Sequence, residues 1–363
     1  RQVHLWLALP LGLLLIVVSL TGSALVWRDP IDRLLNPGRY AVSGTAVALP
    51  LSAYVANATA AAGTGRLPVR MTMPQGPGWP LIVVLRGATA DGKPSRFVTS
   101  YLDPATAKVL DIVDAGSTLM GVVHGIHHML GVPQYSGRQI VGWLGVVLIM
   151  LAASGLVLWW PRTRSLAFAF RWRRSTQLSF NLHHMLGGLL ALPLIAVCLT
   201  GVYLSFPQTA AAFMSSFTAL NGARSHGYSA VPLQAPRQGV DEVARLAREA
   251  AAGASVLAIH FPTAPRGHGH GHHADPSWRI ELGASLNEHA TTVAIDDVTG
   301  TAVLQPPLEA GDRAVKWIEW IHADIRTWSP PTAAYDLVSA HFLHPAPDVR
   351  AAVLAPTSPP PCP

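Results

Sequence analysis

Three segments of the chain are apolar over a length that can cross a lipid bilayer. They contain no acidic or basic side chain and cover Leu5–Trp27, Gln139–Pro161 and Met185–Phe206. A spanning helix needs about 20 such residues at a rise of about 1.5 Å each. Charged residues make up 13% of the chain, whereas a soluble domain has about 25%. The sequence therefore predicts an α-helical membrane protein that is embedded in a lipid bilayer.

Charges around these segments predict the orientation of the chain. Arg28-Asp29-Pro30 follows the first apolar segment, where a signal peptide would have a small-residue cleavage site, so this segment is expected to be a retained helix. Arginines crowd the stretch 162–182, as is typical of a cytoplasmic loop. The N-terminus is then cytoplasmic, and residues 28–138 and 207–321 are external. The same clustering argues against a nucleic-acid-reading surface, so no nucleic-acid partner is expected.

The first and third apolar segments are copies of one pattern. His4 is followed after 17 residues by Thr21-Gly22, and His183 is followed after 17 residues by Thr200-Gly201. Apolar residues flank both pairs. Agreement of this length at two places predicts an internal duplication.

The two external regions repeat as well. Residues 79–110 and 278–304 both alternate as strands do, and both reach an Asp-containing turn with Thr before a further strand. Asp103 in the first copy corresponds to Asp296 in the second. Each external region is therefore predicted to be a small α+β domain. A helical stretch precedes the strands in each copy, and the two stretches are Ser52–Ala62 and Val240–Ala251.

Each external domain leads back to a histidine near the membrane. His127 lies 24 residues after Asp103, and His322 lies 26 residues after Asp296. The order of span, external domain, histidine and span thus occurs twice along the chain. The predicted units are 1–27 (first span), 28–123 (first external domain), 124–161 (second span with the histidines before it), 162–182 (cytoplasmic loop), 183–206 (third span), 207–321 (second external domain) and 322–363 (tail).

The second copy lacks its last span. Three spans are visible and a fourth is expected after His322, but residues 322–363 are rich in proline and hold no apolar run of useful length. A helix does not tolerate that density of proline. Because the repeat is intact up to His322, a frameshift or a misread end is favoured over a genuine loss of the span.

Histidines at membrane helices are costly and indicate function. Two neutral imidazoles from facing helices can supply both axial ligands of a haem iron, which then suits electron transfer. The predicted topology puts one pair of histidines at each side of the bilayer, and so predicts two haems. The candidate ligands are His4 with His183 (or His184) on the cytoplasmic side and His127 (or His124 or His128) with His322 on the external side.

A simpler interpretation competes with ligation. A single histidine at a helix end is more often an interfacial residue with ordinary hydrogen bonds, but recurrence at matched positions favours ligation by the aligned histidines. His127 is preferred over its neighbours because it aligns with His322. The two Thr-Gly pairs are interpreted as helix-packing positions.

A histidine-rich stretch in the second external domain is a separate signal. Flexible tracts of this kind bind copper, nickel or zinc weakly. The first external domain has no counterpart, which favours a dispensable insertion. The candidate metal ligands are His268, His270, His272 and His273.

These motifs resemble the PepSY-associated transmembrane proteins, which are often described as iron-uptake membrane proteins. The resemblance rests on His-x16-Thr-Gly in two spans, on Ser154–Pro161 at the end of the second span and on the turn Asp296–Thr301, and it covers about residues 1–322. It implies four spans in a bacterial inner membrane and two periplasmic PepSY domains. Characterised relatives are siderophore reductases with two b-type haems, which implies haem ligation by the four aligned histidines.

The chain is therefore predicted to be an inner-membrane dihaem cytochrome, an oxidoreductase whose periplasmic electron acceptor is a ferric siderophore. Two alternatives stay open. One is a non-enzymatic PepSY regulator of peptidases, and the other is a metal carrier or transport accessory protein that uses the histidine-rich stretch. The sequence contains no catalytic triad, phosphate loop or dinucleotide fingerprint.

Overall fold

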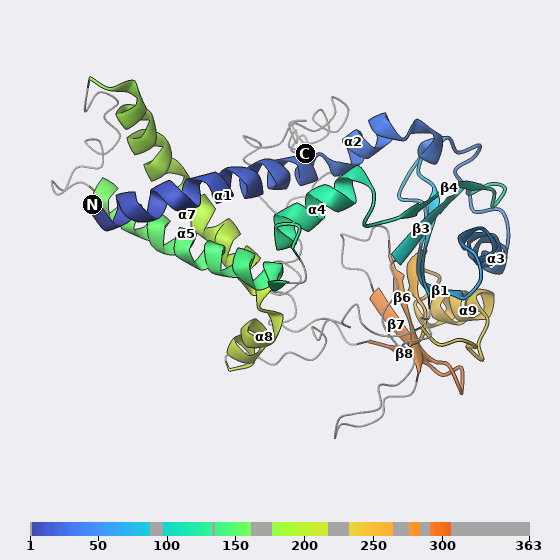
Figure 1. Cartoon of the computed structure of the whole chain (residues 1–363). Helices are drawn as coiled ribbons and strands as arrows, with labels where there is room; N and C mark the ends of the chain where they lie inside the picture. The colour runs from blue at the N-terminus through green and yellow to red at the C-terminus, as the bar shows by residue number, and fades with distance from the viewer. Residues whose placement is uncertain are drawn as a thin grey trace, which may run out of the picture.

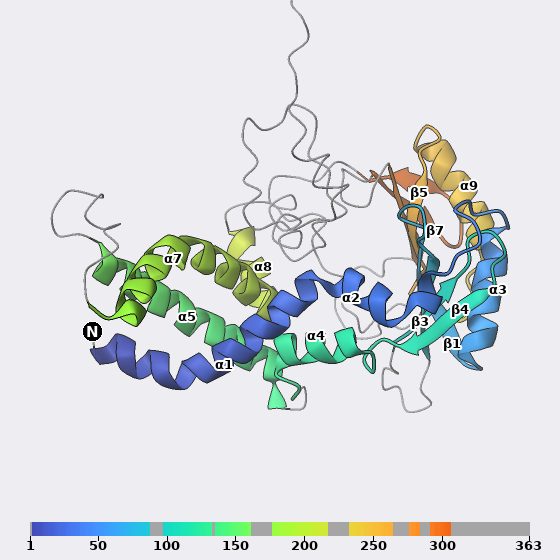
Figure 2. The same cartoon turned by 90° about the horizontal axis from the view of Figure 1, so that it is seen from above.

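The computed structural model describes most of the chain before residue 306. The described residues are 2–87, 97–132, 135–160, 176–216, 232–263, 276–283 and 291–305. Long helices form one half of the described structure and an eight-stranded sheet forms the other (Figure 1). The same division is visible from above (Figure 2). The predicted tail and the histidine-rich stretch lie outside the described residues.

Three long apolar helices lie where the sequence predicts spans. They are α1 (Gln2–Val26), α5 (Gly137–Trp159) and α7 (Leu178–Ser205). By length and composition, α5 and α7 can each cross a membrane, and most of α1 forms a third candidate together with α2 (Arg28–Leu35), from which it is bent by 71°. The helix α7 begins before the predicted unit 183–206, in the stretch assigned to the cytoplasmic loop. The expected fourth span falls outside the described residues.

Close packing of α5 against α7 depends on glycine. Gly188 of α7 lies against the indole of Trp159, and an ideal Cβ at Gly188 would lie 2.2 Å from that ring. Gly142 of α5 lies against Phe206, just beyond α7, in the same way. Small residues at helix contacts are the usual means of helix association in lipid. Large apolar side chains such as Leu192 stay exposed, as expected of a surface that meets lipid. The short helix α8 (Pro207–Ser215) follows α7.

The histidines before the second span lie on a short helix of their own. The predicted unit 124–161 divides into α4 (Leu119–Met129) and α5, and Leu130 between them has a left-handed backbone with φ of 52°. Thr118 caps α4 by accepting a hydrogen bond from the amide of Gly121 at 3.0 Å. Figure 1 shows α4 beside α1. The histidines are therefore carried alongside the first span rather than on a continuation of the second.

The strands of both external regions form one antiparallel sheet. Its order is β4-β3-β2-β1-β5-β6-β7-β8, so four strands from each region meet at the pair β1·β5. The strands are β1 (Arg66–Thr72), β2 (Leu81–Gly87), β3 (Phe97–Leu102), β4 (Val109–Asp114), β5 (Val256–His260), β6 (Ser277–Leu282), β7 (Thr291–Asp296) and β8 (Ala302–Leu304).

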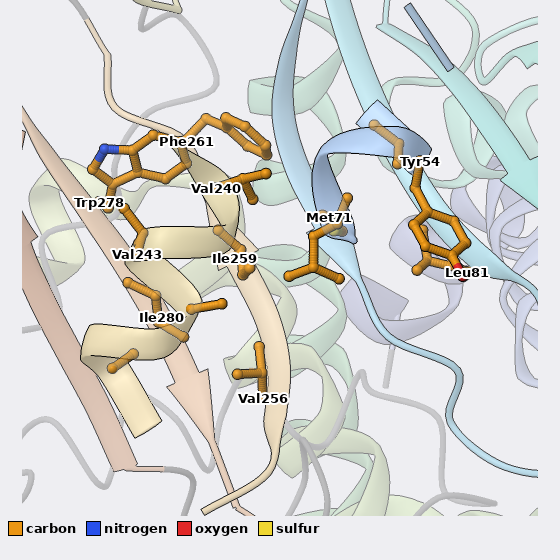
Figure 3. Packing of buried hydrophobic residues seen from close by; sticks show 14 of the residues in the cluster. Tyr54, Met71, Leu81, Val240, Val243, Val256, Ile259, Phe261, Trp278 and Ile280 are labelled. Carbon is orange, nitrogen blue, oxygen red and sulfur yellow. The ribbon is translucent and has the colours of Figure 1, made fainter. Parts of the chain in front are cut away.

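The two regions predicted as units 28–123 and 207–321 share this sheet and one core. Their helices α3 (Leu51–Ala62) and α9 (Val240–Ala250) cover the face that is turned away from α1, α5 and α7 (Figures 1 and 2). Alternate strand residues pack beneath these helices, and the buried cluster continues across the β1·β5 junction (Figure 3). Each large apolar side chain buried there contributes about 1.5–3 kcal/mol. Fully buried members include Tyr54, Met71, Ile259 and Trp278.

The Asp-containing turn has the same backbone geometry in both halves. The amide of Asp103 donates to the carbonyl five residues later at 2.9 Å, and the amide of Asp296 does so at 3.1 Å. The fifth residue of each turn is left-handed, with φ of 55° at Ala107 and 69° at Gly300. The predicted correspondence of the two aspartates therefore describes two matching turns.

Candidate functional site

His127 contacts the Thr-Gly pair of the first span. Its Nδ1 lies 2.9 Å from the carbonyl oxygen of Val18 and 3.3 Å from Oγ1 of Thr21. Both partners belong to α1, whereas His127 belongs to α4. The imidazole therefore rests on α1 at the position that the repeated sequence pattern marks.

The hydrogen-bond partners of His127 decide which ring nitrogen carries the proton. The carbonyl of Val18 can only accept, and the hydroxyl of Thr21 donates to the carbonyl of Val17 at 2.7 Å. Nδ1 of a neutral His127 is then the donor, so the lone pair is on Nε2. A backbone carbonyl that holds Nδ1–H orients the ring of metal-ligating histidines and raises the basicity of the other nitrogen. His127 therefore has the tautomer that Nε2 ligation requires.

Gly22 permits this close approach. An ideal Cβ at Gly22 would lie 2.9 Å from Cε1 of His127, closer than real Cβ atoms approach other atoms. A methyl group at this position would therefore displace the imidazole. At Gly201, the matching position of α7, no atom of the described residues lies within 4 Å of an ideal Cβ. The histidine predicted to align with His127, His322, is outside the described residues.

His124 and His128 form a stacked pair on α4. Their ring centroids are 5.5 Å apart and the ring planes differ by 7°. Residues four apart share one face of a helix, whereas a neighbour in sequence is turned by about 100°. The three alternatives that the sequence left open thus have different surroundings. His127 contacts α1, whereas His124 and His128 stack on each other.

The histidines of the third span lie near the start of α7. His183 is exposed, and His184 is half-buried. The ring of His184 stacks on Phe180, with centroids 6.3 Å apart and planes differing by 3°, and it lies 6.1 Å from the indole of Trp159. Since Trp159 also contacts α7 at Gly188, the aromatic packing holds His184 at the α5–α7 contact, while His183 is presented at the helix surface.

The described histidines of the two predicted pairs lie at opposite ends of the helical half. His4 is in the first turn of α1, and the N-terminal ends of α1 and α7 lie at the same end of the helices in both views (Figures 1 and 2). Thr21, which contacts His127, follows His4 by 17 residues, and this corresponds to about 25 Å along the helix. The helix directions therefore put His4 and His183 at one end and His127 at the other.

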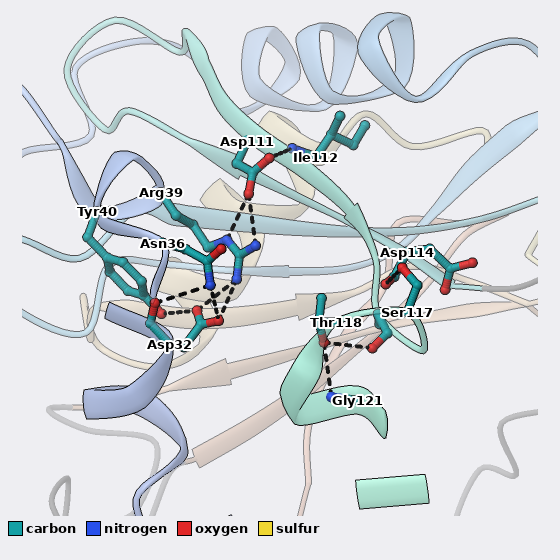
Figure 4. Close-up of polar contacts among 11 residues, drawn as sticks. Asp32, Asn36, Arg39, Tyr40, Asp111, Ile112, Asp114, Ser117, Thr118 and Gly121 are labelled. Atoms are coloured by element: carbon teal, nitrogen blue, oxygen red, sulfur yellow. Dashed lines mark hydrogen bonds and ion pairs between the residues drawn. The ribbon is translucent and has the colours of Figure 1, made fainter. Parts of the chain in front are cut away.

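A charged cluster joins the end of the first span to the sheet. Arg39 of η1 (Pro37–Tyr40) is buried and donates to Asp32 at 2.6 Å and to Asp111 of β4 at 2.9 Å (Figure 4). Burial alone lowers the pKa of Arg39, but its hydrogen bonds to the two carboxylates outweigh burial and raise the pKa above its ordinary value. Sequence reasoning missed this cluster because its members come from three different elements and no spacing marks them.

The predicted weak metal site could not be placed. Its four histidines lie outside the described residues. Within the described part of the chain, no group of three or more His, Cys, Asp or Glu side chains could hold a metal ion. A haem would instead be held by two imidazoles from separate helices, which are too few to form such a group.

A family model described as the PepSY-associated TM region matches residues 1–324, which is most of the chain. No curated protein matches the sequence.

Proposed function

The chain belongs to the PepSY-associated TM family, and from this membership we propose that it is a dihaem b-type cytochrome of the bacterial inner membrane. In this proposal it passes electrons across the bilayer to a periplasmic acceptor, which is ferric iron held by a siderophore. Membership alone makes the chain a membrane protein of this type. The haems and the acceptor are the proposal.

The contact of His127 with α1 carries the proposal. A histidine that only caps a helix end needs no particular tautomer and no glycine opposite its ring. His127 has a defined tautomer, because the carbonyl of Val18 holds Nδ1–H, and it has a glycine opposite its ring, because Gly22 leaves room for the imidazole. Holding the ring in this way supports a ligand role, since it fixes the direction of the Nε2 lone pair before the cofactor binds.

The chain's own residues would hold and shield the cofactors. His4 and His183 would bind one haem at the N-terminal end of α1 and α7, and His127 and His322 would bind the other at the opposite end. Haem b, when bound, supplies a reversible one-electron change between Fe(III) and Fe(II). The apolar side chains of α1, α5 and α7 would exclude water from the region between the two sites. The buried Arg39 cluster would keep the sheet at a fixed place relative to the end of α1.

The chemistry of iron supports the choice of acceptor. Hard oxygen ligands hold Fe(III) far better than Fe(II), because Fe(III) is smaller and more highly charged. Reduction therefore weakens a ferric chelate and releases its iron. A sheet domain attached to one end of the helices would give such a chelate a place to bind.

Reduced-minus-oxidised absorption spectra of the purified, haem-replete protein test the proposal. We expect α and Soret bands in the wild type, and we expect the bands to weaken in His4→Ala and His183→Ala. Thr59→Ala, a change on α3 far from both helix ends, is the control and should leave the bands intact. A haem-replete preparation without these bands would falsify the proposal, and metal binding confined to residues 267–273 would favour the metal-carrier alternative.

A further inference from the structure

The uncovered face of the sheet carries a row of basic side chains at its centre. Strand pairing puts Arg70 of β1 opposite His260 of β5, and His260 opposite Arg279 of β6. Residues that are opposite each other in antiparallel strands point to the same face. Their neighbours Met71, Ile259 and Ile280 are buried beneath α3 and α9, so this basic row faces the other way.

The basic row exists only because the two halves of the sheet are joined. Arg70 comes from the first half, and His260 and Arg279 come from the second. Adjacent strands are about 4.8 Å apart, so the row spans about 10 Å across three strands. Figures 1 and 2 show that the face opposite α3 and α9 is turned toward α1 and α4. The row therefore lies on the side of the sheet that faces the helical half.

Positive charge exceeds negative charge on this part of the sheet. Arg86 of β2 belongs to the same face, because its neighbour Leu85 points into the buried cluster on the other face, and its guanidinium lies over the ring of Phe97 at 4.9 Å. Glu281 is the acid within the group, with Oε1 3.1 Å from Nε2 of His260 and Oε2 3.9 Å from Arg70. Among these described residues, three arginines and one glutamate leave a surplus of positive charge when His260 is neutral.

Two other acids of this face are engaged elsewhere. Asp111 is bound by Arg39 through two nitrogens, Nε at 2.9 Å and an amino nitrogen at 2.8 Å. Asp296 accepts hydrogen bonds from the amide of Thr299 at 2.6 Å and from its hydroxyl at 2.9 Å. Glu281 is thus left as the acid that contacts the basic row within the described structure.

This arrangement costs stability and needs an explanation. Arg70 and Arg279 lie on either side of His260 on one face, and their like charges repel each other. Burial lowers the pKa of Arg279, and proximity to Arg70 lowers it further, although Glu281 acts in the opposite direction. Nε of Arg70 is buried and has no hydrogen-bond partner among the described residues. Sequences depart from such local rules mainly at functional sites.

We propose that the basic row of Arg70, His260 and Arg279 binds a small soluble anion with several carboxylate groups. The planar guanidinium fork matches a carboxylate in a two-point hydrogen bond, which favours carboxylates for a pair of arginines. A row of about 10 Å is too wide for one phosphate or acetate and fits an anion whose carboxylates are several ångströms apart. The identification of this anion as a polycarboxylate ferric chelate rests on the proposed function. The binding of an anion by the basic row does not depend on that function.

Calorimetric titration of the full chain in detergent micelles with citrate, at low ionic strength, tests this site. We expect Arg70→Gln and Arg279→Gln each to weaken citrate binding about tenfold or more, because each removes a charged hydrogen-bonding partner. Arg245→Gln is the matched control. It removes the same charge from α9 on the other side of the sheet, where Arg245 pairs with Glu242 and Glu249, and it should leave binding unchanged.

A variant that should bind citrate more tightly separates loss of the site from misfolding. Glu281→Gln removes the acid of the group and should strengthen citrate binding, which a damaged fold cannot do. Acetate and inorganic phosphate should bind more weakly than citrate. Equal citrate affinities in the wild type, Arg70→Gln and Arg279→Gln, or no saturable binding by the folded wild type, would overturn the proposal. The titration needs no haem, so its failure leaves the proposed cytochrome intact, and missing haem bands leave this site intact.

Discussion

The candidate site requires a residue without a side chain at Gly22, because Cε1 of His127 lies only 2.9 Å from where a Cβ would be. The repeated Thr-Gly pattern marks this position, and the sequence predicts close packing at it, because a glycine in a spanning helix brings another surface near. The partner was not predictable in the same way. His127 is over 100 residues away, and its contact with Val18 follows from how α4 packs on α1.

We expect Gly22→Ala to disturb the docking of His127. The new methyl group would overlap the imidazole, and overpacking of this kind costs about 1–3 kcal/mol. Gly12→Ala makes the same change on the same helix, at a position where no described atom lies within 4 Å of an ideal Cβ, and it should be tolerated. Thermal unfolding in detergent compares the two variants. Equal stability of both variants would contradict the steric account of Gly22.

A pair of aspartates shows where residue-level prediction stops. Asp103 was identified by its turn, but its carboxylate also binds the backbone amide of Ser43 at 2.8 Å. In the second half of the sheet, two neighbouring aspartates take these two roles. Asp296 holds its own turn, while Asp297 accepts hydrogen bonds from the amide of Arg237 at 2.9 Å and from Nε1 of Trp278 at 2.8 Å. Asp297 was missed because its partners are distant in sequence.

Asp103→Asn should destabilise the sheet by about 1–3 kcal/mol at neutral pH, since hydrogen bonds to a charged group are lost. Burial raises the pKa of Asp103, but hydrogen bonds from Ser43 and Thr106 outweigh it, so the folded pKa is below the ordinary value. A lowered pKa gives stability above the unfolded pKa of about 3.9 and loses it as pH falls through the folded pKa. The difference between wild type and variant should therefore be constant above about pH 5 and shrink below about pH 4. Denaturant titrations at several pH values measure it, and a pH-independent difference would contradict this assignment.

At the scale of elements, the spans were the most predictable part. A run of apolar residues without charge is a local signal, and α1, α5 and α7 lie close to the predicted limits. The separation of α4 from α5 was not predicted. It depends on Leu130 with φ of 52°, a conformation that no local signal of a leucine indicates. The strands were also predictable from the alternation of apolar and polar residues, because one face of the sheet is buried.

The link between α2, η1 and β4 should depend on Arg39. Arg39→Met would leave Asp32 and Asp111 without their shared cation, and breaking a buried pair costs about 3 kcal/mol. Hydrogen exchange of backbone amides should become faster in residues 37–40 and 109–114 than elsewhere. Arg245→Met, which removes an exposed arginine of α9, should leave exchange in both stretches unchanged. Unchanged exchange in Arg39→Met would show that the cluster does not hold these elements together.

At the scale of the whole molecule, the sheet joins two regions that the sequence presents as separate units. The order of helix and strands in each half followed from local pattern. The pairing of β1 with β5 did not, because it brings together Met71 and Ile259 from distant parts of the chain. Both residues have ordinary strand patterns that fit an internal or an edge strand equally well. The basic row was missed for the same reason, since it is assembled at this junction.

One shared core predicts that the two halves of the sheet unfold together. Ile259→Ala should cost about 2–5 kcal/mol through the cavity that it leaves at the junction. Amide exchange should then accelerate to the same extent in β2 of the first half and in β7 of the second. Val303→Ala, at an exposed position of β8, is the control and should change neither. Faster exchange in β7 alone would mean that the halves are independent.

The haem content of His127→Ala tests the central claim most directly, with His124→Ala as its control on the same helix. Pyridine haemochromogen assays of purified, haem-replete protein give the ratio of haem to chain. The account predicts about two haems per chain in the wild type, about one in His127→Ala and an unchanged ratio in His124→Ala. A wild-type ratio in His127→Ala, or a loss in His124→Ala alone, would contradict the assignment of His127 as a haem ligand.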